Sequence, residues 1–293
     1  MPDFVVIANP VSGGGRGRKV GEAVARAFGE RGVRAELRLT EGRGDGARIA
    51  AEALSEGIRR FAVCGGDGSI GEVAGALAHS DAALGIVPSG RGNDTGRALG
   101  IPTGLKAAVE VLISGEEWRI DLGRVGERYF CTVACVGFDA EAGRAVYEHE
   151  VPFSGTAAYV LAALKTLMTY RGPEARISGD FGVFEGPILL AAVGNTGFYG
   201  GGMQVLPQAA CDDGLLDVCV IDPLPRLKLL RFFPRIFSGT HVDLPEARVL
   251  KSRSVRIESS RPLWILADGE PACETPAQVE VIPKALTVIV PVR

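Results

Sequence analysis

The first third of this 293-residue chain alternates short apolar runs with amphipathic stretches, and a polar or glycine-rich loop follows each apolar run. Parallel strands need crossover connections, so this alternation predicts a parallel sheet with helices on both faces. Ligands on such sheets bind at the carboxyl ends of the strands. The expected strands are 4–8, 34–39, 60–64 and 83–88, and the expected helices are 17–31, 45–55, 70–78 and 104–113.

The pattern changes after about residue 121, where several runs alternate apolar and polar residues. Such alternation predicts an antiparallel sheet or a sandwich. The expected strands are 129–138, 188–195, 215–221, 248–259, 263–270, 278–283 and 286–292. Two helices are expected within this half, over 155–170 and 226–237, and Pro234 is expected to bend or end the second one.

Composition narrows the class of partner. The net charge of −3 argues against binding a polyanion through bulk charge, so no nucleic-acid partner is expected. The apolar runs, such as 157–164, are far shorter than the roughly 20 residues that span a bilayer, so any membrane contact must be peripheral. The three histidines are isolated and show no zinc-type spacing.

Three loops in the first half have the composition of phosphate-binding loops: "NPVSGGGRGRK" (9–19), "GGDGS" (65–69) and "PSGRGND" (88–94). Glycines leave backbone N–H groups free to face an anion at a helix N-terminus. Each loop alone can equally be an ordinary turn. Asp67 then either caps a helix or holds magnesium, water or a hydroxyl, and Asn93 or Asp94 can equally be an N-cap.

The second half has two carboxylate clusters. "CDDGLLDV" carries Asp212, Asp213 and Asp217, and "LADGEP" carries Asp268 and Glu270. Carboxylates can take a proton from a hydroxyl or bind magnesium. Asp-Gly pairs are also common in hairpin turns, so each cluster alone has a purely structural explanation.

The segment 224–239 mixes large apolar residues with Arg226, Lys228, Arg231 and Arg235. A basic amphipathic helix of this kind can lie in a membrane interface. The alternative is a helix packed on the core with a solvated basic edge.

The motifs also occur in a particular order: "NPVSG", "GGDGS", "PSGRGND", "GFDA", "DDGLLD" and "DGE". This ordered series resembles the bacterial diacylglycerol kinase and lipid kinase family, which shares its catalytic domain with sphingosine kinases. The resemblance extends from residue 9 to residue 270 and implies a doubly wound α/β nucleotide-binding domain at 1–122. The resemblance further implies a β-sandwich-like lipid-substrate domain at 123–293, whose last strand can return to the first domain, with ATP expected in the cleft between the two.

The resemblance also implies roles for particular residues. Glu270 would be the general base, with Asp67 and Asp268 as further catalytic carboxylates. Magnesium would be bound by Asp213 and by the carbonyl oxygens of Ala210 and Leu215. The implied ATP contacts are Asn9, Pro10, Ser12, Gly13, Thr40, Gly65, Gly66, Asp67, Gly68, Ser69, Ile70, Gly71, Gly90, Arg91, Asn93 and Asp94.

Two positions depart from the family pattern. Arg91 replaces the usual threonine of Gly-Thr-x-Asn-Asp, which leaves a nucleotide contact at this position open, and Ser69 replaces another threonine but keeps the hydroxyl. NAD kinases also carry GGDG, but their Asn-Glu adenosine motif has no counterpart here, because the sequence contains no Asn-Glu pair. A third interpretation is a non-catalytic regulator that binds a lipid or a nucleotide. The joint presence of Asp67, Asp213 and Glu270 argues against it.

We therefore expect an ATP-dependent lipid kinase that uses Mg²⁺ and transfers the γ-phosphoryl group to a lipid hydroxyl, with diacylglycerol as the first choice of acceptor. We expect the protein to be cytoplasmic and to associate peripherally with the membrane. Members of the family can dimerise, which leaves a homodimer open.

Overall fold

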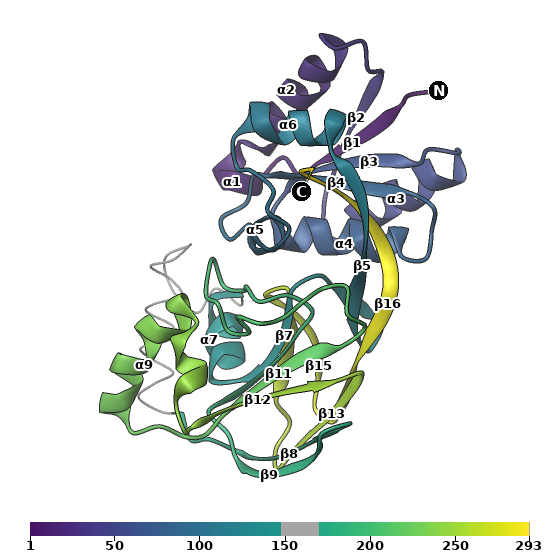
Figure 1. The fold of residues 1–293 in the computed structure, drawn as a ribbon. Coiled ribbons are helices and arrows are strands. Elements are labelled where there is room, and N and C mark those ends of the chain that lie inside the picture. Colours follow the sequence, from purple (N-terminus) through teal and green to yellow (C-terminus); the bar gives the residue numbers. More distant parts are fainter. Residues whose placement is uncertain (148–169, 293) are drawn as a thin grey trace. The chain divides into compact units, whose positions relative to one another are not determined.

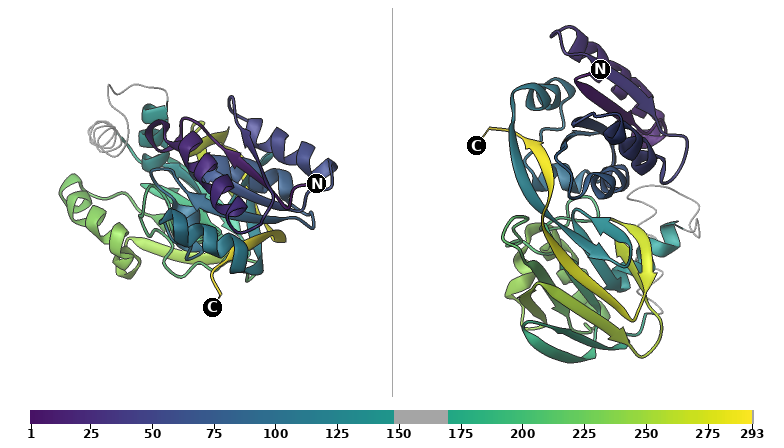
Figure 2. Two further views of the ribbon diagram at one scale, coloured as in Figure 1. Left: turned by 90° about the horizontal axis from the view of Figure 1, so that it is seen from above. Right: turned by 90° about the vertical axis from the view of Figure 1, so that its right-hand side faces the viewer.

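The computed structural model describes residues 1–147 and 170–292, and the chain divides into two compact units. The first unit comprises 1–122 and 283–293, and the second comprises 123–282. Two strands, β5 (Glu116–Val125) and β16 (Ala277–Val290, the long yellow strand of Figures 1 and 2), have residues in both units. Apart from Tyr170, the helix expected over 155–170 lies outside the described residues.

The first unit contains a parallel sheet in the order β2-β1-β3-β4-β16. β1, β3 and β4 are largely apolar runs and almost entirely buried, as expected for a parallel sheet covered on both faces, whereas β2 (AELRL) alternates and is only partly buried. The bounds are β1 Phe4–Ala8, β2 Ala35–Leu39, β3 Arg60–Gly65 and β4 Ala83–Pro88.

Helices cover both faces of this sheet (Figure 1). On one face α2 and α6 pack on strand residues such as Val6 and Ala62, and α3 and α4 cover the other face. Each fully buried aliphatic side chain in such a layer stabilises the fold by about 1.5–3 kcal/mol. The helices are α1 Ser12–Gly15, α2 Gly17–Gly29, α3 Asp45–Ser55, α4 Asp67–Leu77, α5 Asp94–Ala98 and α6 Leu105–Ser114.

The strand order reverses between β1 and β3. β2 lies on one side of β1, and β3 followed by β4 lies on the other side. Such a switch point opens a crevice at the carboxyl ends of the strands, where ligands of doubly wound sheets bind. The expected doubly wound α/β architecture is confirmed, and the loops after β1 and β3 flank its switch point.

The second unit is built on antiparallel sheets. One sheet has the order β12-β11-β10-β7-β14-β15, and β13 pairs with both β8 and the first part of β16. The bounds in this unit are β6 Arg128–Phe130, β7 Val133–Gly137, α7 Phe138–Tyr147, β8 Glu174–Gly179, β9 Gly182–Pro187, β10 Leu190–Gly194, β11 Leu216–Ile221, α9 Arg226–Ser238, η1 Thr240–Asp243, β12 Ala247–Ser252, β13 Ser254–Ser259, β14 Trp264–Ala267 and β15 Glu270–Glu274.

Alternate residues of the six-stranded sheet face two different cores. Val218 and Val220 of β11 pack with Ile257 of β13 in the core between the sheets, which is the expected sandwich. Cys219 and Ile221 point the other way, into a core shared with α7 and α9. Because both faces are covered, β11 is buried along its whole length.

Several local expectations for the second half were wrong. The run 129–138 is two strands followed by α7, and the run 248–259 is two strands that belong to different sheets. The two runs expected over 278–283 and 286–292 are the single strand β16, and β5, β8 and β9 were missed. Pro234 lies inside α9 and does not end it, because the helix continues to Ser238. In the first unit, α4 begins at Asp67, three residues before the expected helix.

Candidate functional site

In the first unit, four loops leave the carboxyl ends of β1 to β4 at one edge of the sheet. Backbone hydrogen bonds continue past the strands and tie these loops together. Asn9 N–H donates to the carbonyl of Cys64, Thr40 N–H to that of Ala8, and Ser89 N–H to that of Gly65, at 3.0–3.3 Å. The predicted ATP contacts of all four loops are therefore brought to the same edge.

The loop after β1 is shaped by Asn9 and by glycines. The Asn9 side chain accepts a hydrogen bond from Val11 N–H at 3.1 Å, and its amide lies 3.4 Å from the Ser69 hydroxyl at the start of α4. Gly13 has a φ of 58°, and a Cβ added there would lie 2.4 Å from the carbonyl oxygen of Ser89. Glycine is therefore required at this position both by conformation and by space.

The GGDG loop after β3 is packed against the loop after β4. A Cβ on Gly90 would lie only 2.4 Å from Cα of Gly66, so the two backbones approach each other with no side chain between them. Gly68 and Ser69 belong to the first turn of α4, whose unpaired N–H groups favour an anion at this end of the helix. This is the arrangement expected of a phosphate-binding edge.

Asp67 is held by the loop after β4. Its Oδ1 accepts hydrogen bonds from the Thr95 N–H at 2.8 Å and the Thr95 hydroxyl at 3.0 Å. The carboxylate thus caps α5 from the neighbouring loop. The reading of Asp67 as a cap is correct, but the helix that it caps is α5 and not its own.

The loop around Arg91 is held by the side chain of Asn93. Asn93 adopts a φ of 54° and folds back on Gly90, accepting from its N–H at 2.8 Å and donating to its carbonyl at 3.2 Å. Asp94 is buried and forms an ion pair with Arg97. The two hydrogen bonds between Asn93 and Gly90 close the turn that contains the exposed Arg91.

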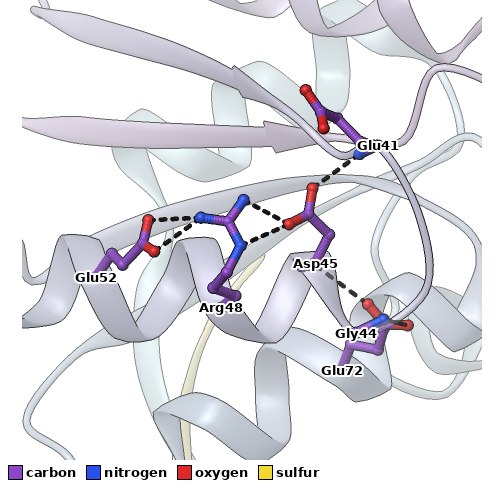
Figure 3. Close-up of polar contacts among 7 residues, drawn as sticks. Glu41, Gly44, Asp45, Arg48, Glu52 and Glu72 are labelled. Atoms are coloured by element: carbon purple, nitrogen blue, oxygen red, sulfur yellow. Dashed lines mark hydrogen bonds and ion pairs between the residues drawn. The ribbon is translucent and has the colours of Figure 1, made fainter.

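The loop after β2, which follows the buried Thr40, is held by α3 and α4 (Figure 3). Asp45 accepts from the N–H of Glu41 at 2.8 Å, and Glu72 of α4 accepts from the N–H of Gly44 at 2.9 Å. Arg48 bridges Asp45 and Glu52 along α3. The hydrogen bond from the Glu41 N–H, and to a smaller degree the one from Arg48, hold the pKa of Asp45 below its usual value. Glu72 was not foreseen as part of this edge.

In the second unit, the "DGE" motif is a hairpin. Asp268 and Gly269, with φ of 51° and 78°, connect β14 to β15. Positive φ at both central residues marks a type I′ turn, which Asp-Gly favours. The structural reading of this Asp-Gly pair is therefore correct, and the same turn presents Glu270 as the first residue of β15.

The Asp268 carboxylate anchors that turn. It accepts hydrogen bonds from the N–H groups of Cys131 and Thr132, both at 2.8 Å, and from the Thr132 hydroxyl at 2.6 Å. Such bonds to a carboxylate are stronger than neutral ones. Asp268 is well placed to fix the hairpin, and its predicted part in catalysis stays a prediction.

The turn at 210–215, which is predicted to bind magnesium, is bound by the side chain of Lys251. Asp213 accepts the N–H of Leu215 at 3.0 Å with one oxygen and binds Lys251 Nζ at 2.7 Å with the other. Lys251 Nζ also lies 3.4 Å from Oδ2 of Asp217, a buried carboxyl whose pKa is raised by burial. That Oδ2 has no hydrogen-bond partner among the described residues.

The oxygen atoms of this turn are chemically suited to magnesium, because the ion prefers carboxylate and carbonyl oxygens as ligands. The carboxylate of Asp213 also keeps lone pairs that its present hydrogen bonds do not use. Lys251 would compete with the ion for the same oxygens. Within 1–147 and 170–292, no group of three or more His, Cys, Asp or Glu side chains could hold a metal. Carbonyls such as those of Ala210 and Leu215 would therefore have to complete the site.

Asp139 is a further buried acid, at the start of α7. Its Oδ1 accepts the Ala140 N–H at 2.9 Å, and Oδ2 has no hydrogen-bond partner in the described part of the chain. Burial raises the pKa of Asp139 to about 6, although the nearby Cys135 thiol and Tyr199 hydroxyl lower it. Phe138 and Leu229 line the small apolar cavity beside it.

Two family models together match most of the chain. The family model "Diacylglycerol kinase catalytic domain" matches residues 3–125, and "YegS C-terminal NAD kinase beta sandwich-like domain" matches 132–290. A protein named "Diacylglycerol kinase" from Mycobacterium tuberculosis (strain H37Rv) is 36% identical over 297 residues, which cover 97% of this chain and 94% of the relative.

Two further similarities extend over nearly the whole chain. A "Probable lipid kinase YegS-like" from Stenotrophomonas maltophilia is 33% identical, over 96% of this chain and 94% of its own. The crystal structure of a diacylglycerol kinase from Bacillus anthracis superposes with a TM-score of 0.75 at 23% identity, covering 99% of this chain and 97% of that one, which shows the shared fold. The chain belongs to this lipid kinase family.

Membership makes the chain an enzyme of the lipid kinase class, for which ATP is the co-substrate. Four residues that organise the candidate site of this lipid kinase were missed from the sequence: Glu72, Thr95, Arg128 and Lys251. Their bonds to loop residues join positions far apart in the chain, so no local motif could reveal them.

Proposed function

We propose that this chain transfers the γ-phosphoryl group of ATP to the free hydroxyl of diacylglycerol, giving phosphatidic acid. Relatives named diacylglycerol kinase, at 30–36% identity over more than nine-tenths of the chain, support this choice of acceptor. The observation that carries the nucleotide part is the close packing of the glycine loops at the switch point of the first unit.

On the nucleotide side, backbone N–H groups at Gly65–Gly68 and the N-terminus of α4 would bind and neutralise phosphate oxygens. Phosphoryl transfer needs positioning and electrostatic stabilisation more than covalent help from the protein. Loops whose shapes are already fixed, by Asn93 on Gly90 and by Thr95 on Asp67, lose little entropy when the phosphates bind. Asn9, Thr40 and the loop around Arg91 would complete the nucleotide contacts.

On the acceptor side, Glu270 would take the proton of the lipid hydroxyl as it attacks. The side chain is about one-quarter exposed, which leaves a hydroxyl access to it. It stands on a hairpin whose turn is anchored by Asp268. A general base has to be held within hydrogen-bond reach of the proton that it removes, and this rigid mounting serves that purpose.

Magnesium is part of the proposal. Asp213, with the carbonyls of Ala210 and Leu215, would bind it, and the ion would supply positive charge to a turn that also carries Asp212 and Asp217. Lys251 now supplies part of that charge.

We further propose that the enzyme works from the cytoplasm at a membrane surface. No helix among the described residues is long and apolar enough to cross a membrane. Helix α9 buries Leu229, Phe232 and Ile236 against the core, as in the core-packed alternative. Its exposed edge still offers Lys228, Arg231, Arg235 and a half-exposed Phe237, a combination suited to an anionic lipid surface.

The test is phosphoryl transfer from radiolabelled ATP to a panel of diacylglycerol, a sphingoid base, another hydroxylated lipid and NAD. We expect phosphatidic acid as the main product. Glu270→Gln, which keeps size but removes the base, should lower kcat by at least about 100-fold. Glu274→Gln, an exposed position on the same strand, is the matched control and should keep wild-type activity. Preferred phosphorylation of NAD, or full activity of Glu270→Gln, would contradict the proposal.

A further inference from the structure

The Glu270 side chain is held by an arginine from a distant part of the sequence. Arg128 Nη2 donates to Glu270 Oε2 at 2.8 Å, and the two side chains are 28% and 26% exposed. A charge-assisted hydrogen bond of this kind is about twice as strong as a neutral one. Because neither group is fully solvated, salt screens the pair less than a surface pair.

The position of Arg128 is itself fixed. It is the first residue of β6, directly after the turn at Gly126 (φ 56°), and it pairs with Val125 of β5. On the same strand pair, Phe130 covers Gly123, where a Cβ would lie 2.0 Å from the ring. A register slip would lose this fit, so the hairpin presents Arg128 from a defined position.

The same segment holds the turn of the Glu270 hairpin from its other side. Cys131 and Thr132, which follow β6, donate to Asp268, while Arg128 binds Glu270. Residues 128–132 therefore contact both residues that flank Gly269. The first contact fixes the backbone of the turn, and the second fixes the direction of the carboxylate.

We propose that Arg128 is a positioning residue for phosphoryl transfer, which orients the carboxylate of Glu270 to accept the proton of the lipid hydroxyl. The proposal rests on the role of Glu270 proposed above. A carboxylate has about four lone-pair sites, so a hydroxyl can donate to it while Oε2 stays bound to the guanidinium. Without Arg128, the carboxylate would lose the contact that fixes Oε2, and a misplacement of about 1 Å can cost roughly 100-fold in rate.

The experiment measures kcat and both KM values for Arg128→Ala. We expect kcat to fall about 10- to 100-fold while the KM for ATP is unchanged, because the nucleotide loops belong to the first unit. Guanidinium ion, added at a concentration too low to unfold the protein, should restore part of kcat, and sodium chloride at equal ionic strength should not. Arg128→Lys keeps a charge and a donor, so its kcat should lie between those of Arg128→Ala and the wild type.

Arg124→Ala is the matched control. Arg124 lies on the adjacent strand β5 and forms an ion pair with Glu280, with side-chain exposures of 40% and 37%. Its loss removes an arginine–glutamate pair from the same unit without touching the hairpin of Glu270, so kcat should be unchanged.

The results separate this inference from the proposed function. If Glu270→Gln is inactive but Arg128→Ala keeps wild-type kcat, or loses only thermal stability and gains nothing from guanidinium, the inference is overturned and the function stands. If Glu270→Gln is fully active, the assigned base is wrong. Should Arg128→Ala fail to fold, Arg128→Lys decides, since a purely structural ion pair predicts wild-type kcat per folded molecule.

Discussion

The loops after β3 and β4 in the first unit and the carboxylate turns of the second unit are held in place by different means. In the first unit, glycine backbones pack against each other, and short neutral side chains such as Asn93 and Thr95 hold the loops. In the second unit, Glu270 is held by the cation of Arg128 and Asp213 by that of Lys251. The approach of the loops after β3 and β4 is therefore limited by space at Gly66 and Gly90, whereas Glu270 and Asp213 of the second unit are each held by a cation.

This difference predicts how each region fails. A loop that binds phosphate through its N–H groups has no side chain to lose, but it cannot accept an added one. A turn that presents a carboxylate tolerates added volume at its exposed edge, but it depends on the charge that faces it.

The largest effect is expected from a single methyl group in the first region. Gly90→Ala would place a Cβ 2.4 Å from the backbone of Gly66, so the loops after β3 and β4 would have to separate. The N–H groups that would bind phosphate would be displaced, and kcat/KM for ATP should fall at least about 100-fold. Steady-state kinetics with ATP as the varied substrate measure this.

Gly104→Ala is the control for Gly90→Ala, because a Cβ there meets nothing within 4 Å and its φ of −74° suits any residue. A wild-type KM for ATP in Gly90→Ala would show that the close approach of the two loops is not needed for nucleotide binding.

Asp139 is a buried carboxyl of the second unit, and its Oδ2 has no hydrogen-bond partner among residues 1–147 and 170–292. Its pKa is raised from 3.8 to about 6 in the folded state, so between these values the folded state keeps a proton that the unfolded state releases. Stability must therefore fall as pH rises from about 4 to 6 and stay reduced above that, by roughly 2–3 kcal/mol in total.

Asp139→Asn removes this titration. The variant should be more stable than the wild type by roughly 2 kcal/mol above pH 7, and the difference should shrink toward pH 4. Urea unfolding at several pH values measures it. Asp243→Asn, at an exposed position of the same unit, should change stability by less than about 0.5 kcal/mol. A difference for Asp139→Asn that does not vary with pH would contradict the assigned cause.

The strands β1 to β4 and the helices α2, α3, α4 and α6 of the first unit were predictable from sequence because each is a single local pattern. Apolar runs such as 83–88 ended where expected. The alternation of strands and helices was compatible with a doubly wound α/β fold. The second unit required information that local alternation lacks. The run 248–259 alternates throughout, yet the chain changes sheets at Arg253. β16 continues as one strand from Ala277 to Val290 although Lys284 in its middle adopts a φ of 50°.

The site divides in the same way. Glycine loops and the Asp-Gly turn could be read from short motifs, because backbone conformation is local. The partners that hold their side chains could not, since Arg128 is 142 residues from Glu270 and Lys251 is 38 residues from Asp213. Nothing in the composition of "GRVGERYF" distinguishes Arg128 from Arg124, which pairs elsewhere.

The smallest effect concerns magnesium. Lys251 and the ion would compete for Asp213, so Lys251→Met should strengthen magnesium binding. The lysine and the aspartate are 40% and 30% exposed, so their pair is worth at most about 1 kcal/mol, which corresponds to roughly fivefold in affinity. Binding stabilises the folded state, and the rise of melting temperature with MgCl₂ gives the affinity without any measurement of activity.

Lys228→Met is the matched control for the magnesium experiment, because Lys228 pairs with Glu246 at 2.7 Å in the same unit and away from the turn. It should leave the response to MgCl₂ at the wild-type value, and Asp213→Asn should abolish that response. If the melting temperature of no variant depends on MgCl₂, the proposed magnesium site is wrong. If wild type and Lys251→Met respond equally, the ion binds without competing with the lysine, and the charge of Lys251 serves only to hold Asp213 and Asp217 together.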